Sequence, residues 1–98
     1  MEKVFKAGIA CPGRASGRIV KSPEERGILV LGKAFPDLVL NPRVTKGIIL
    51  KEGGLLSHPA VLAREHRIPC VVCPDFDLDR GTVELDAFHG IIRVLKEE

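Results

Sequence analysis

The residues best suited to chemistry lie in one short segment in the middle of the chain. Gly53 and Gly54 lead into a Ser57-His58 pair, and Pro59 begins a run that favours a helix. A neutral imidazole is nucleophilic near pH 7, because the unperturbed pKa of histidine is about 6.5. Free N–H groups at a helix start stabilise an anion, and glycines let the backbone approach a bulky group. These residues together meet the chemical requirements of a phosphoryl-accepting histidine, with Gly53, Gly54 and Ser57 beside the phosphate.

The same residues also have plainer interpretations. A lone histidine at a helix start is commonly a cap or a surface residue, and serine there more often caps the helix than binds a ligand. At about 100° per residue, Leu62 and Glu65 fall on the same side as His58, so Glu65 is a candidate for orienting the ring. Arg64 points away, and we expect it to form ion pairs at the surface or with another element.

The elements that position this segment are mostly short strands. The main helix is expected from Pro59, which suits a first turn, to His66, because the following Ile68-Pro69 disfavours helical backbone. A second short helix is predicted from Pro36 to Leu40. Apolar runs bounded by Gly or Pro predict strands at residues 16–20, 28–31, 47–50, 70–72, 82–85 and 91–95. The fold class is therefore α/β, with short strands and one main helix.

Composition narrows the class of protein. The 98 residues are 45% hydrophobic and 29% charged, which fits one globular domain over residues 1–98. Four Phe without Trp or Tyr, and a net charge of +2 without a basic run, argue against nucleic-acid binding. No apolar run approaches the roughly 20 residues of a membrane span, and the N-terminal residues do not resemble a signal peptide. We expect a cytoplasmic protein.

The three cysteines do not suggest a disulfide framework or a metal site. Cys70 and Cys73 form a Cys-x-x-Cys, but residues three apart in a strand face opposite sides. Without a second pair, Cys11 or a histidine would have to complete a tetrahedral site. We expect these side chains to pack in the core and the chain to bind no metal.

Further charged residues fit the surface. Asp75, Asp77 and Asp79 alternate after a proline, but the glycine and glutamate of a calcium loop are absent, so a solvated acidic turn is expected. His66 and His89 lie among charged or turn residues and are interpreted as surface histidines.

The His58 segment resembles the phosphohistidine signature of the phosphoenolpyruvate-utilising enzymes, which include pyruvate phosphate dikinase, phosphoenolpyruvate synthase and enzyme I of the sugar phosphotransferase system. The resemblance continues through Ala63-Arg64-Glu65, Ile68-Pro69 and Val71-Val72 in order and spacing. The run from Gly8 to Gly17 is similar to the opening motif of the family, and Gly81 to Gly90 to its closing hairpin. The resemblance implies the swivelling (mobile) phosphohistidine domain, a layered β/β/α fold.

This chain departs from the family pattern at four positions. Leu56 stands where many members have threonine, so a role of that threonine is not transferred. Pro59 replaces a small residue, Cys73 a glycine, and Ala34 the threonine that precedes Pro36-Asp37 in the family.

The resemblance also implies a function in phosphotransfer. His58 would carry the phosphoryl group on Nε2, while Mg²⁺ and ATP or phosphoenolpyruvate would be bound by partners, an ATP-grasp-type nucleotide-binding subunit and a phosphoenolpyruvate-binding barrel. Neither fits within 98 residues, so we expect a phosphotransferase component of a kinase-type enzyme that binds no cofactor itself and cannot complete catalysis alone. The alternative is a non-catalytic regulatory or small subunit of the dehydratase type. The Ser57-His58 pair favours the carrier, because fold maintenance does not need an exposed histidine.

Overall fold

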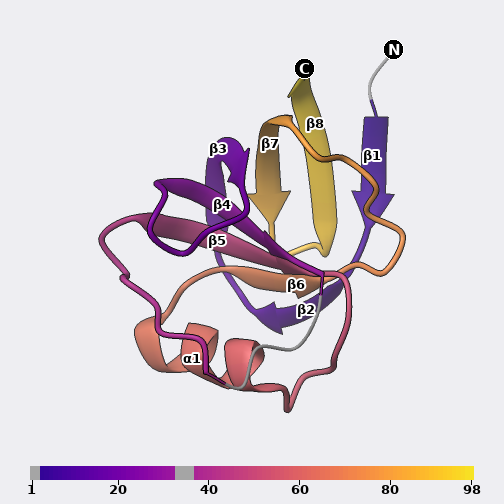
Figure 1. Ribbon diagram of the computed structural model, residues 1–98. Coiled ribbons are helices and arrows are strands. Elements are labelled where there is room, and N and C mark those ends of the chain that lie inside the picture. The colour runs from indigo at the N-terminus through magenta and orange to yellow at the C-terminus, as the bar shows by residue number, and fades with distance from the viewer. Residues whose placement is uncertain (1–2, 33–36) are drawn as a thin grey trace.

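The computed structural model describes residues 3–32 and 37–98, which form eight strands and one helix (Figure 1). The elements are β1 (Lys3–Lys6), β2 (Gly8–Cys11), β3 (Arg14–Val20), β4 (Gly27–Leu31), β5 (Thr45–Leu50), α1 (His58–His66), β6 (Cys70–Val72), β7 (Gly81–Asp86) and β8 (Ile91–Glu97).

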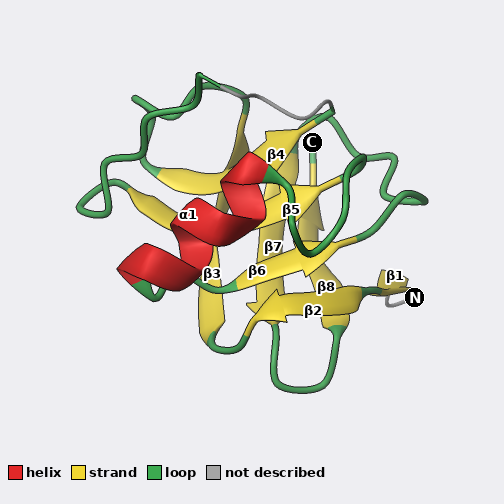
Figure 2. Cartoon of the chain, turned by 90° about the horizontal axis from the view of Figure 1, so that it is seen from below, coloured by secondary structure: helices red, strands yellow, loops and turns green. Residues whose placement is uncertain are grey.

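The strands form two connected parts that share β3. Their order is β1-β8-β7-β3-β4-β5-β6-β2. Residues 14–18 of β3 pair antiparallel with β7, while Ile19 and Val20 pair parallel with β4. The β4, β5 and β6 strands continue in parallel, and β2 closes that edge in the antiparallel sense. Figure 2 shows α1 lying across the parallel strands. The layers are therefore sheet, sheet and helix, as the family resemblance implies.

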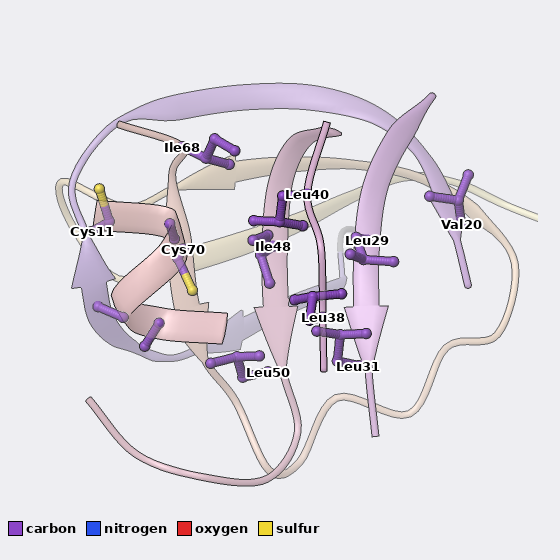
Figure 3. Close-up of a cluster of buried hydrophobic side chains, with 13 residues drawn as sticks. Cys11, Val20, Leu29, Leu31, Leu38, Leu40, Ile48, Leu50, Ile68 and Cys70 are labelled. Carbon is purple, nitrogen blue, oxygen red and sulfur yellow. The ribbon is translucent and has the colours of Figure 1, made fainter. Parts of the chain in front are cut away.

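Two hydrophobic cores hold these layers together. Leu29, Leu31, Ile48 and Leu50 belong to the core under α1, and Figure 3 shows Ile48 and Leu50 nearer the helix than Leu29 and Leu31. The intervening residues of β4 and β5, such as Ile28, belong to a second core with β7 and β8. Both faces of β4 and of residues 47–50 of β5 are thus buried, which explains why these segments are apolar without interruption.

The predicted main helix is confirmed, beginning one residue earlier at His58. It ends at His66, because the next residue, Arg67, has a left-handed φ of 56°, and the Ile68 N–H donates to the Ala63 carbonyl. Within the described residues, no helix is long and apolar enough to cross a membrane.

The second helix predicted for Pro36 to Leu40 is wrong over its described part. Pro36 lies outside the described residues, Asp37 is in a turn, and 38–40 have no regular structure. Leu38 and Leu40 are buried in the core under α1, whereas Val39 between them is 81% exposed. An extended backbone places alternate side chains on one side, so burial of both leucines outweighs the local signals for a helix.

All six predicted strands form, and β1 and β2 are additional. The β1 strand, Lys-Val-Phe-Lys, is largely exposed and pairs with β8, and β2 pairs with β6. Both lie at sheet edges, where pairing with a distant strand supplies the stabilisation that a four-residue segment lacks alone.

Candidate functional site

The N-terminus of α1 has no side-chain cap. Ser57 occupies the cap position with extended backbone, but its side chain makes no capping hydrogen bond. Its hydroxyl instead donates to the Gly54 carbonyl at 2.8 Å, so the plainer interpretation of Ser57 as a side-chain cap does not hold. The first helical bond runs from the Val61 N–H to the Ser57 carbonyl, and the first turn contains no acidic residue. The positive end of the helix dipole therefore faces outward without a neutralising carboxylate.

The loop before the helix is closed by its own hydrogen bonds. The Gly54 carbonyl accepts from both the Ser57 N–H, at 3.1 Å, and the Ser57 hydroxyl. Gly53 has a φ of +96°, and a Cβ there would lie 3.2 Å from the Ser57 Cβ, so this position requires glycine. Gly54 has open space around it. The loop presents Leu56, 89% exposed, immediately before Ser57 and His58.

Arg64 fixes this loop from the following helix, a role that its position did not predict. Its Nη2 donates to the Leu55 carbonyl at 2.6 Å, and its Nη1 donates to the Ala10 carbonyl at 3.2 Å. The guanidinium thus joins the His58 loop to β2 and forms no ion pair within the described residues. The predicted ion-pair role is wrong, because backbone carbonyls of two elements lie within reach of the long side chain.

His58 is exposed, and one of its ring nitrogens has a definite partner. Nε2 lies 3.2 Å from the carbonyl oxygen of Leu38. Because a carbonyl only accepts, Nε2 carries the proton in this arrangement, and Nδ1 keeps the lone pair when the ring is neutral. Leu38 is 7% exposed, so its carbonyl belongs to a segment anchored in the core. The main chain 20 residues earlier therefore orients the imidazole.

The predicted role of Glu65 has no contact to support it. Glu65 is exposed on α1, and no hydrogen bond within residues 3–32 and 37–98 joins it to His58. The structure thus brings together His58, Ser57, Gly53 and Gly54, while the partner of the ring is the Leu38 carbonyl. A surface cavity of about 640 Å³ is lined by residues 21–24, 31 and 37–41; its lining includes Leu38 but not His58.

The cysteines pack as expected. All three are reduced and buried, with Cys70 in the core under α1 and Cys73 in the core between the sheets. Burial raises the pKa of Cys70 to about 12, an effect that the nearby Cys11 reinforces and Arg64 opposes, so the thiol is protonated at neutral pH. Among the described residues, no three His, Cys, Asp or Glu side chains are grouped to hold a metal ion.

The acidic turn is solvated, as predicted. Asp75, Asp77 and Asp79 are exposed, and two of them form surface ion pairs, Asp77 with Lys3 at 3.5 Å and Asp79 with Lys21 at 3.4 Å.

The fold resembles those of two solved structures. The chain matches the "N-terminal domain of Enzyme 1 - Nitrogen" with a TM-score of 0.57 and 26% identity, over 74% of this chain and 32% of that one. Aconitase X (holo-form) of Thermococcus kodakaraensis matches with a TM-score of 0.70, over 95% of this chain and 98% of that one. At 20% identity, this second likeness is one of fold alone and does not support a dehydratase-type subunit.

Sequence comparison identifies the family to which this chain belongs. A probable phosphoenolpyruvate synthase of Methanothermobacter thermautotrophicus is 42% identical over 95 residues, covering 85% of this chain and 14% of that relative. This chain therefore spans a small part of the relative's length. The family described as PEP-utilising enzyme, mobile domain, matches residues 23–90, which include every residue of the candidate site. The chain belongs to the mobile-domain family of the phosphoenolpyruvate-utilising enzymes.

Proposed function

We propose that this mobile domain is a phosphoryl carrier in which His58 accepts a phosphoryl group from one partner and delivers it to another. The observation that supports this most directly is the exposed imidazole at the uncapped N-terminus of α1. A phosphoryl group on the ring would lie near the positive end of the helix dipole, which stabilises its negative charge.

The transfer itself needs only an unprotonated ring nitrogen. Its lone pair attacks the phosphorus of the donor, the bond from phosphorus to the leaving oxygen breaks, and the nucleotide or enolpyruvate departs with the bonding electrons. The other ring nitrogen keeps its proton, so the ring becomes cationic. Ser57 can turn its hydroxyl hydrogen from the Gly54 carbonyl to a phosphoryl oxygen, and Gly53 and Gly54 leave space for the donor.

The family resemblance assigns the attack to Nε2, which here donates to Leu38. The ring must therefore leave this carbonyl and move its proton to Nδ1 before Nε2 can react. A hydrogen bond of this kind contributes about 1 kcal/mol net, which reduces the released population about 5-fold. The Leu38 contact would slow phosphorylation on Nε2 without preventing it.

The rest of the reaction requires groups outside residues 1–98. We propose that an ATP-grasp-type nucleotide-binding partner and a phosphoenolpyruvate-binding barrel partner hold ATP or phosphoenolpyruvate together with Mg²⁺. In this arrangement the carrier binds no cofactor of its own, and it alternates between the two partners through the surface around Gly53 to Pro59. The exposed Leu56 would contact each partner in turn.

The test is labelling of the full chain with an extract of its own source. Radiolabelled ATP and phosphoenolpyruvate are supplied in turn, and the expected product is acid-labile, alkali-stable label on the wild type. His58→Ala should lose the label and stay folded, because the side chain is exposed. His66→Ala, at the other end of α1, is the matched control and should label normally. Absence of label from both donors with an active extract would refute the carrier.

A further inference from the structure

A second imidazole, in the turn between β7 and β8, is held more firmly than His58. Nδ1 of His89 lies 2.9 Å from Oδ2 of Asp86. Oδ1 of the same carboxylate accepts the N–H groups of Phe88, at 3.0 Å, and His89, at 3.1 Å. The Asp86 side chain is 4% exposed, whereas that of His89 is 64% exposed. A buried carboxylate thus orients an accessible ring.

The carboxylate also fixes which nitrogen of His89 is reactive. The Asp86 carboxylate is acceptor-only, so Nδ1 carries a proton and Nε2 of the neutral ring has the lone pair. Hydrogen bonding to a carboxylate holds the ring in one tautomer and stabilises the cationic ring that forms when the opposite nitrogen reacts. His58 shows the opposite arrangement, with Nε2 engaged.

A cation forms an ion pair with the same carboxylate. Nη2 of Arg14 is 3.5 Å from Oδ2 of Asp86, the oxygen that also contacts His89. The Arg14 guanidinium carbon lies 5.9 Å from the centre of the Phe88 ring, and its side chain is 61% exposed. A guanidinium beside an imidazole attracts phosphate-type anions and can donate to their oxygens.

The Asp86 carboxylate is ionised at neutral pH, as this arrangement requires. Desolvation by burial acts to raise its pKa. The hydrogen bonds from the His89 ring and from the Phe88 and His89 N–H groups, with the charge of Arg14, outweigh that effect and lower the pKa from 3.8 to about 2.

From this geometry we infer that His89 is a second nucleophilic histidine, a modification site that accepts a phosphoryl group on Nε2 from small phosphoryl donors. With phosphoramidate, whose nitrogen is protonated (P–NH3⁺) in the reacting zwitterion, the Nε2 lone pair attacks phosphorus, the P–N bond breaks, and ammonia leaves with the bonding electrons. Nδ1 keeps its proton, and the Asp86 carboxylate balances the new positive charge of the ring. The site does not depend on His58 or on the partners of the carrier.

Phosphoramidate labelling of the full chain tests this site. Phosphopeptides are mapped at alkaline pH, and the two phosphohistidine isomers are separated. His89 should carry the Nε2 isomer and should label about 10-fold faster than His66, whose ring has no hydrogen-bond partner among the described residues. His58→Ala should leave labelling of His89 unchanged. Labelling of His89 no faster than His66, or mainly on Nδ1, would overturn the inference.

Two variants separate orientation of the ring from simple exposure. Asp86→Asn keeps an oxygen acceptor for the turn N–H groups but removes the charge, so the rate at His89 should fall to that of His66. Arg14→Gln removes the cation while leaving the Asp86–His89 contact, and it should slow the reaction without changing the isomer. If Asp86→Asn does not fold, two measurements still test the inference: which nitrogen of His89 is phosphorylated in the wild type, and the labelling rate of His89 in Arg14→Gln. An unchanged rate in folded Asp86→Asn would contradict the role of the carboxylate.

Discussion

Removing Arg64 should open the His58 loop while leaving the two cores in place. Arg64 is exposed on α1, yet its guanidinium donates to the carbonyls of Leu55 and Ala10. Arg64→Ala removes both hydrogen bonds, whereas Arg64→Lys keeps the charge but loses the fork that reaches two acceptors. We therefore expect the alanine variant to be the most affected and the lysine variant to be intermediate.

The free energy by which Arg64 stabilises the closed loop is the gain from its two hydrogen bonds minus the cost of ordering its side chain. A hydrogen bond to a charged group contributes about 1.5–3 kcal/mol, and solvent exposure places these two at the low end. Ordering an arginine side chain opposes them by up to about 2 kcal/mol. The net contribution is then about 1–2 kcal/mol, which corresponds to about a 5- to 30-fold change in the population of the open loop.

Amide hydrogen exchange measures this population directly. The Ser57 N–H donates to the Gly54 carbonyl only while the loop is closed, so its exchange should accelerate about 5- to 30-fold in Arg64→Ala. Arg67→Ala is the matched control, because the Arg67 side chain makes no hydrogen bond with the described residues. Unchanged exchange at Ser57, or an equal change in the Arg67 control, would refute the assignment of Arg64 as the fixing residue.

Three further perturbations probe the loop, the core and the buried carboxylate. Gly53→Ala places a side chain at a φ of +96°, so it should destabilise by about 1 kcal/mol and slow His58 labelling, whereas Gly54→Ala, with open space around it, should change neither. Phe76→Ala removes a ring that is 1% exposed and should reduce the urea-derived unfolding free energy by about 3–5 kcal/mol. Phe88→Ala, whose ring is 58% exposed, should cost far less, and equal losses would contradict the core assignment. The pKa of Asp86 is about 2 in the folded chain against 3.8 ordinarily, so its stabilisation is complete above about pH 4 and is lost as the pH falls towards 2. Urea midpoints measured from pH 2 to 6 should show this loss in the wild type and a smaller one in Asp86→Asn.

The elements that could be predicted from the sequence are those whose signals lie within the element itself. The helix start could be predicted because Pro59 and the apolar spacing act within one turn. The β4 strand and residues 47–50 of β5 are continuous apolar runs, which burial on both faces requires. For Pro36 to Leu40, the proline signals indicated a helix, but burial of Leu38 and Leu40 in a distant core decided the backbone.

The candidate site was predictable in its side chains but not in its contacts. Gly53 and His58 are recognisable because the glycine pair, the Ser57-His58 pair and the helix that follows match the family signature in order and spacing. The Leu38 carbonyl has no sequence signal, because any residue at that position offers the same atom. The reach of Arg64 back to Leu55 depends on a loop path that helix periodicity does not describe, and the Asp86–His89 contact depends on the turn between β7 and β8.

The pairing of the first and last strands has a mechanical consequence. Lys3 of β1 lies opposite Val94 of β8, so both ends of the domain emerge along one sheet edge, and Figure 1 shows this edge on the opposite side of the molecule from α1. Any polypeptide joined to either end would pull on the same edge. The domain could then rotate as a rigid body about that attachment. Because α1 lies on the opposite side, a small rotation would displace His58 by a large distance while both cores stay intact.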